Sequence, residues 1–139
     1  MGGAYNHSSS DDRLKHNEIV IADALATIRK LSPQKYQKTD VMKDADYMGP
    51  VDEPYRNEAG FIAQEVLEIP ELAYAVSEGA HEDPDGVEHS IYYLRYQEIF
   101  VHSVAAIKEL DLTVQTQAAQ LISQAARLDI LEARLAAMQ

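Results

Sequence analysis

The feature that most constrains this chain is a run of residues near its C-terminus spaced alternately three and four apart. Eight of its ten positions are apolar, and the run comprises Ile107, Leu110, Val114, Gln117, Leu121, Gln124, Leu128, Leu131, Leu135 and Met138. This spacing is a heptad pattern, which is typical of coiled coils. No glycine or proline occurs from Tyr96 onward, so we predict one long helix from about residue 96 to the end.

The apolar seam formed by these ten residues needs a partner, because so small a body cannot bury it. The most direct partner is another copy of the chain in a parallel coiled coil. With Ile107 at heptad position a, Gln117 and Gln124 fall at successive d positions, where paired glutamines fix register and chain number. Arg127 at g and Glu132 at e are then placed to pair between neighbouring chains. The alternative is a helix packed within a monomer.

Composition restricts the class of partner and of chemistry. The 139 residues, 46% hydrophobic and 25% charged, suit one domain with a modest core. A net charge of -11 argues against binding nucleic acid or an anionic membrane, so we expect a protein partner. The absence of cysteine excludes disulfides, cysteine-ligated zinc and thiol catalysis. Neither a secretory signal nor a membrane span is expected, and the Gly/Ser-rich residues 1–9 are predicted to be a junction to an upstream region.

Local patterns predict a small body over residues 10–98. Apolar residues at Ile21, Leu25, Ile28 and Leu31 predict a helix over 17–31, which Pro33 ends. A short strand is expected over 34–39, followed by a long polar loop or arm over 40–59.

The second half of the body is predicted to contain a hairpin. A buried strand over 60–63 leads into a short helix over 64–69 that Pro70 stops. Strands over 74–76 and 91–94 flank an acidic turn whose tip is Asp83-Pro84-Asp85-Gly86. The expected fold is therefore α+β, a small mixed body followed over 99–139 by the helix of a parallel coiled coil.

A hydroxyl and an amine lie close together in the segment Ser10-Asp11-Asp12-Arg13-Leu14-Lys15. A Ser–Lys pair can cut a peptide bond without metal or cofactor once desolvation has lowered the pKa of the amine. Five steps along one α-helix separate two side chains by about 140°. Either Ser10 precedes the helix and Lys15 reaches back, or the lysine acts on the serine of a neighbouring chain. The bond nearest the hydroxyl is Ser9–Ser10; in the alternative interpretation, Ser10 or Asp11 simply caps a helix.

Other candidate sites are weaker. The five histidines are His7, His16, His81, His89 and His102, and their spacing is not that of metal ligands. Two of them, His7 and His16, lie near enough to Ser10 in the sequence to act as its base in place of Lys15. An acidic stretch comprises Glu78, Glu82, Asp83, Asp85 and Glu88. These residues could bind calcium, but they lack the regular alternation of an EF-hand loop, so we expect a solvated hairpin tip. No cofactor or metal is predicted.

Three segments together resemble a known family. They are Ser10 to Lys15, then Gly60-Phe61-Ile62-Ala63-Gln64-Glu65-Val66 with Pro70-Glu71, then Tyr93-Leu94-Arg95-Tyr96 leading into residues 105–110. They are similar to the C-terminal intramolecular chaperone domains of phage tail spikes and tail fibres, also classed as S74 self-cleaving peptidases, which include the endosialidase chaperone domain. The likeness extends from Ser10 to Gln139.

The resemblance implies a domain that forms a homotrimer, guides folding of the upstream fibre or spike of the same polypeptide in the host cytoplasm, and releases itself by cleavage. It implies that Ser10 is the nucleophile, that Lys15 is its general base and that the cleaved bond is Ser9–Ser10. Asp11 and Arg13 would shape the turn. The arm over 40–59 and the hairpin over 77–90 would hold the unfinished fibre. The alternatives are a non-catalytic trimerisation tip that stays attached and a monomeric helical adaptor.

Overall fold

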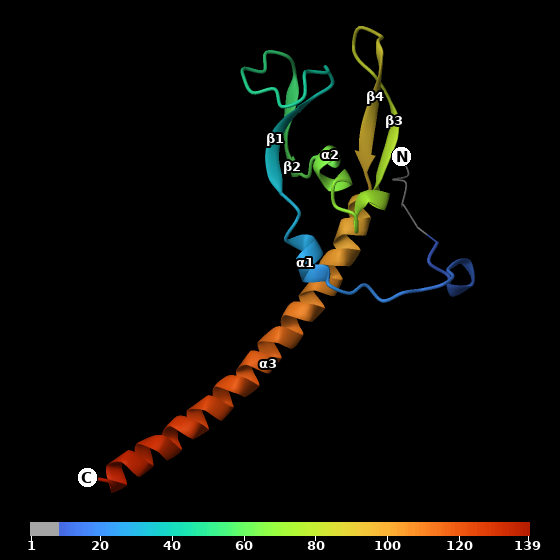
Figure 1. The fold of residues 1–139 in the computed structure, drawn as a ribbon. Helices are drawn as coiled ribbons and strands as arrows, with labels where there is room; N and C mark the ends of the chain where they lie inside the picture. Colours follow the sequence, from blue (N-terminus) through green and yellow to red (C-terminus); the bar gives the residue numbers. More distant parts are fainter. Residues whose placement is uncertain (1–8) are drawn as a thin grey trace, which may run out of the picture.

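A computed structural model describes residues 9–139 as two β-hairpins mounted on the N-terminal end of one long helix (Figure 1). The elements in chain order are a 3₁₀ turn η1 (Asp12–Leu14), α1 (Ala24–Ile28), β1 (Gln34–Thr39), β2 (Tyr55–Gly60), α2 (Ala63–Leu67), η2 (Ala73–Ala75), β3 (Val76–Glu82), β4 (Glu88–Leu94) and α3 (Tyr96–Ala137). Figure 1 shows α2 at the base of the hairpins and α3 extending away from them. The predicted α+β body with a long C-terminal helix is confirmed.

Each hairpin is a separate two-stranded antiparallel sheet. Strands β1 and β2 pair from Gln34 opposite Gly60 to Thr39 opposite Tyr55. Strands β3 and β4 pair along their whole length and are joined by the predicted acidic turn. In that turn Asp83 Oδ1 accepts hydrogen bonds from two backbone N–H groups, and Gly86 adopts a φ of 80° that favours glycine.

The hydrophobic core is small and lies where α2 meets the base of the β3–β4 hairpin. Its centre is formed by Val66, Ile69 and Leu72, which are buried. Four half-buried side chains pack around this centre, namely Leu31, Phe61, Val76 and Leu94. Burial of one such aliphatic side chain contributes about 1.5–3 kcal/mol to the free energy of unfolding, so this cluster stabilises the packing of α2 against the β3–β4 hairpin.

Helix α1 is held against α3 by a carboxylate far away in the sequence. Glu109 accepts hydrogen bonds from the backbone N–H groups of Ala24 and Leu25, both at 2.8 Å. These two bonds hold the pKa of Glu109 below its ordinary value. Because the first N–H groups of a helix have no partner within it, Glu109 determines where α1 begins.

The predicted helix over 17–31 is wrong, because only Ala24–Ile28 is helical. Asn17 and Asp23 have left-handed backbone conformations with φ of 58° and 54°, which interrupt a helix. Ile19 and Val20 between them are exposed, so no part of the described chain packs against a helix there.

Strand boundaries differ from the prediction in the rest of the body. The loop predicted over 40–59 ends in β2, whose polar residues pair with β1. The strand expected over 60–63 retains only Gly60, while Tyr74 and Ala75 of the next predicted strand belong to η2. The helix expected over 64–69 is α2, at Ala63–Leu67. None of the helices in residues 9–139 has the length and apolar character required to cross a bilayer.

Candidate functional site

Ser10 and Lys15 lie within hydrogen-bonding distance of each other. Lys15 Nζ donates to Ser10 Oγ at 2.5 Å, within the same chain. Ser10 precedes the turn η1, and Lys15 follows it in an extended conformation with φ of -119° and ψ of 136°. Of the two arrangements considered from the sequence, this is the one in which the lysine reaches back to the serine of its own chain.

The turn between the two side chains is fastened by Asp11 and Arg13. Asp11 Oδ1 accepts hydrogen bonds from Arg13 N and Nε, and Oδ2 accepts one from Arg13 Nη2, each at 2.9 Å. The guanidinium is the main reason that the pKa of Asp11 is lowered from its ordinary value. Two backbone bonds close the turn, from Leu14 N to Asp11 O and from Lys15 N to Asp12 O. The backbone reversal and the ion pair together bring the amine to the hydroxyl.

Water has free access to this pair in the single chain, since every residue from Ser9 to Val20 is exposed. An amine acts as a base only after losing its proton, which contact with water opposes and burial favours. Within the described residues, Lys15 and not the neighbouring His16 is the side chain bonded to Ser10. The other rival base, His7, and all of the predicted junction 1–9 except Ser9 lie outside the described residues.

The apolar seam of α3 is exposed along its length. The 42 residues of α3 span about 63 Å, and every residue from Leu110 onward is exposed. The apolar seam residues are between 48% and 83% exposed; they are Ile107, Leu110, Val114, Leu121, Leu128, Leu131, Leu135 and Met138. A row of this kind is what helices of a coiled coil bury against one another.

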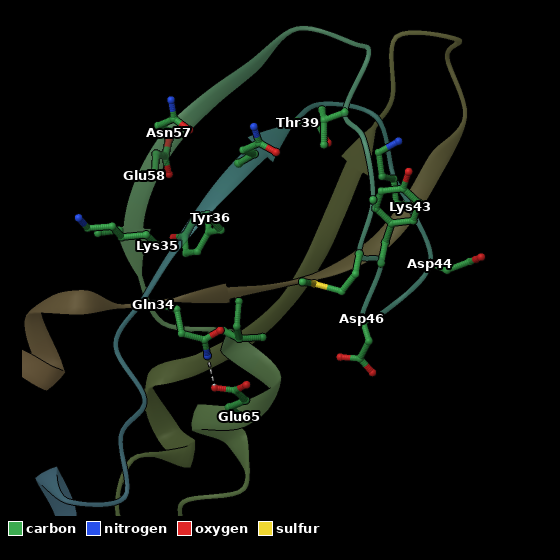
Figure 2. A pocket seen from close by; sticks show the side chains of 17 residues that line it. Gln34, Lys35, Tyr36, Thr39, Lys43, Asp44, Asp46, Asn57, Glu58 and Glu65 are labelled. Atoms are coloured by element: carbon green, nitrogen blue, oxygen red, sulfur yellow. Dashed lines mark hydrogen bonds between the residues drawn. The ribbon is translucent and has the colours of Figure 1, made fainter.

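An open groove of about 1070 Å³ lies between the β1–β2 sheet and the arm that joins the strands (Figure 2). Lys43 in the arm forms an ion pair with Glu53 and lies 4.7 Å from the ring centre of Tyr47. Tyr47 Oη donates to the carbonyl of Pro50 at 2.8 Å. These contacts shape the arm, which the resemblance assigned to holding the fibre.

The acidic tip of the β3–β4 hairpin is stabilised by one of its own carboxylates, that of Asp83. Asp83 Oδ2 lies 3.0 Å from His89 Nε2, and this hydrogen bond is the main cause of the lowered pKa of Asp83. His81 Nε2 lies 2.9 Å from the carbonyl oxygen of Asp40, which links this hairpin to the arm of the other. Over residues 9–139, no three acidic or histidine side chains are grouped as metal ligands would be.

Two structural features were missed by the sequence analysis. The first is Glu109, described above. The second is Gly60, where a Cβ atom would lie 2.1 Å from Tyr96 Oη and 2.7 Å from Tyr36 Oη. Tyr96 Oη also accepts a hydrogen bond from Phe61 N at 3.1 Å, and hydrogen bonding with Tyr96 is the main cause that raises the pKa of Tyr36 to about 12. Gly60 and Tyr96 both lie in segments of the resemblance, but their spacing in the sequence does not predict that they lie against each other.

Part of the chain is similar to a known protein family. Residues 10–77 match the family model Peptidase S74, described as chaperone of endosialidase. The match begins at Ser10 and includes the turn, α1, the first hairpin, α2 and the start of β3. No curated protein matches the chain.

Proposed function

We propose that the chain is a self-cleaving intramolecular chaperone of a phage tail fibre or spike, because residues 10–77 match the family model Peptidase S74, described as chaperone of endosialidase. In this role it trimerises, assists folding of the upstream region of the same polypeptide in the host cytoplasm, and then separates from it. The observation that carries the enzymatic part is the 2.5 Å contact between Lys15 Nζ and Ser10 Oγ at the start of the family match.

The proposed reaction cuts the bond between Ser9 and Ser10 once. Uncharged Lys15 takes the proton from Ser10 Oγ, and the oxygen attacks the carbonyl carbon of Ser9. The C–N bond breaks, the Ser10 nitrogen receives the proton from Lys15, and an ester joins Ser9 to the Ser10 side chain. Water then hydrolyses the ester, leaving a carboxylate on Ser9 and a free amine and hydroxyl on Ser10. The chemistry needs no metal or cofactor.

Assembly is proposed as the condition for this chemistry. Three copies of α3 would bury their seams in a parallel coiled coil, with Gln117 and Gln124 at the axis and Arg127 paired with Glu132 of the next helix. The proposal requires that the assembly also shields the exposed Ser10–Lys15 turn from water, because an amine loses its proton more readily when it is desolvated. Cleavage would therefore follow assembly rather than precede it.

Intact-mass measurement of a longer precursor tests the cleavage. We expect a new N-terminus at Ser10, its loss in Ser10→Ala and Lys15→Ala, and its retention in the matched control His16→Ala. Cleavage that continues in Lys15→Ala but stops in His16→Ala would mean that His16, and not Lys15, is the base. A wild-type precursor that is trimeric by sedimentation and stays intact would remove the enzymatic claim.

The second candidate is a trimerisation tip that remains attached to the fibre without cutting it. The exposed seam favours it as much as it favours the first candidate, since both need the coiled coil. If the chain is such a tip, Ser10→Ala and Lys15→Ala should not change the mass of the product. If the chain is a self-cleaving chaperone, both variants should accumulate as the uncut precursor.

A further inference from the structure

Two acidic residues lie between the serine and the lysine of the Ser10–Lys15 turn. Asp11 is four residues before Lys15, and Asp12 is three residues before it. On a helical turn, side chains three and four residues apart are neighbours, and a carboxylate and an amine at that separation form an ion pair readily. A carboxylate beside an amine favours the charged form of the amine, which cannot take a proton from a hydroxyl. The sequence therefore brings to the base a kind of group that opposes its action.

Arg13 occupies the carboxylate of Asp11. Its Nε donates to Oδ1 and its Nη2 donates to Oδ2, each at 2.9 Å, and its backbone N–H also donates to Oδ1. The planar guanidinium fits a carboxylate with two parallel bonds, which the single ammonium group of a lysine cannot do. Hydrogen bonding within the pair lowers the pKa of Asp11 and raises the pKa of Arg13, so both groups are charged and their charges cancel.

The amine of Lys15 is left to the serine. In the part of the chain that the structure describes, the ion pairs do not include Lys15, and its Nζ donates to Ser10 Oγ instead. Figure 1 shows η1 apart from the hairpins and from α3, so the charged and titratable groups around the amine in the described chain belong to its own segment. These groups are Asp11, Asp12, Arg13, His16 and Glu18.

We propose that Arg13 is a positioning residue for the cleavage, because by binding and neutralising Asp11 it prevents that carboxylate from pairing with Lys15. This role rests on the proposed function, since it concerns the self-cleavage. The hydrogen bonds of the Arg13 side chain go to Asp11, so Arg13 acts on the amine through that residue. Water around the exposed turn weakens charge effects in the single chain, and the shielding required of the assembly strengthens them.

A set of charge variants in a longer precursor tests this role. Asp11 and Arg13 together carry no net charge in the wild type, one negative charge in Arg13→Ala, one positive charge in Asp11→Asn and none in the double variant. The measurement is the rate of cutting at Ser9–Ser10 as a function of pH. We expect the pH of half-maximal rate to rise by about one unit or more in Arg13→Ala and to fall in Asp11→Asn. In the double variant it should return close to the wild-type value.

The pH of half-maximal rate separates this role from a merely structural one. If Arg13 only shaped the turn, the three variants would cut more slowly at every pH without a change in that midpoint, and this result would overturn the proposal. The control Arg29→Ala removes an exposed arginine that follows α1, and it should keep the wild-type rate and midpoint.

Two further outcomes concern precursors that stay uncut. If Arg13→Ala is uncut at every pH, cutting by the double variant supports the proposal, and an uncut double variant overturns it; sedimentation checks that both have the wild-type mass. A wild-type precursor that stays uncut overturns the proposed function and this role with it. A wild-type precursor that is cut, with one midpoint shared by all variants, overturns the role of Arg13 alone.

Discussion

Replacement of Gly60 by alanine should destabilise the body through one crowded contact. The added Cβ would lie 2.1 Å from Tyr96 Oη and 2.7 Å from Tyr36 Oη, so Tyr96 must retreat by about 1 Å. That movement strains the hydrogen bond that Tyr96 accepts from Phe61 N at 3.1 Å. Overpacking costs about 1–3 kcal/mol and a lost hydrogen bond about 0.5–1.5 kcal/mol, so we expect Gly60→Ala to lower the free energy of unfolding by about 2–4 kcal/mol.

A double substitution isolates the contact. Tyr96→Phe removes the oxygen nearest to the new methyl group, and by itself costs about 0.5–1.5 kcal/mol because Phe61 N loses its acceptor. The double variant Gly60→Ala/Tyr96→Phe should then be more stable than the sum of the two single effects predicts, by about 1–2 kcal/mol. Urea unfolding at one fixed protein concentration gives all four values, since the stability of an assembling protein depends on concentration.

Two outcomes would refute this account of Gly60. Strict additivity of the single effects would mean that the alanine does not meet the Tyr96 hydroxyl. Wild-type stability of Gly60→Ala would mean that the close approach of the two tyrosines to the end of β2 is not a feature of the folded protein.

Two further predictions concern the seam and the tyrosine pair. Leu121→Asp and Leu128→Asp each place a charge at a seam position, so both variants should sediment as monomers. The control Ile122→Asp changes the adjacent position b and should sediment as a trimer. A trimeric Leu121→Asp variant would count against the seam. The pKa of Tyr36 is raised from 10.0 to about 12, chiefly by its hydrogen bond with Tyr96. The folded state therefore keeps a proton that the unfolded chain loses, and the free energy of unfolding should fall as the pH rises from 10 towards 12. Tyr36→Phe should reduce that fall, and an unchanged slope would contradict the assignment.

The elements that could be predicted from sequence are those whose determinants are local. Helix α3 was predictable because its periodicity and lack of glycine and proline persist from Tyr96 onward. The turn at Asp83–Gly86 was predictable because the aspartate cap and the positive φ of Gly86 are properties of the turn itself.

The elements that were mispredicted depend on distant partners. The spacing of Ile21, Leu25 and Ile28 fits a helix, yet α1 starts at Ala24 because a carboxylate 85 residues away binds its first N–H group. The polar strand β2 gives almost no alternation of its own, and its extended form comes from pairing with β1.

The candidate site was only partly predictable. The residue types in Ser10 to Lys15 pointed to a hydroxyl and its base, but their spacing did not decide whether they meet within one chain. The contact depends on the 3₁₀ turn and on the Asp11–Arg13 ion pair, which the spacing of the residues alone does not predict. The cleavage and its dependence on assembly remain predictions.

The position of Glu109 links two events at opposite ends of the sequence. Its carboxylate anchors α1, and it lies between Ile107 and Leu110, the first two positions of the seam. In the proposed coiled coil, separation of the helices and release of α1 would involve the same turn of α3. We therefore expect the two events to be coupled, so that unfolding shows both losses in a single cooperative transition.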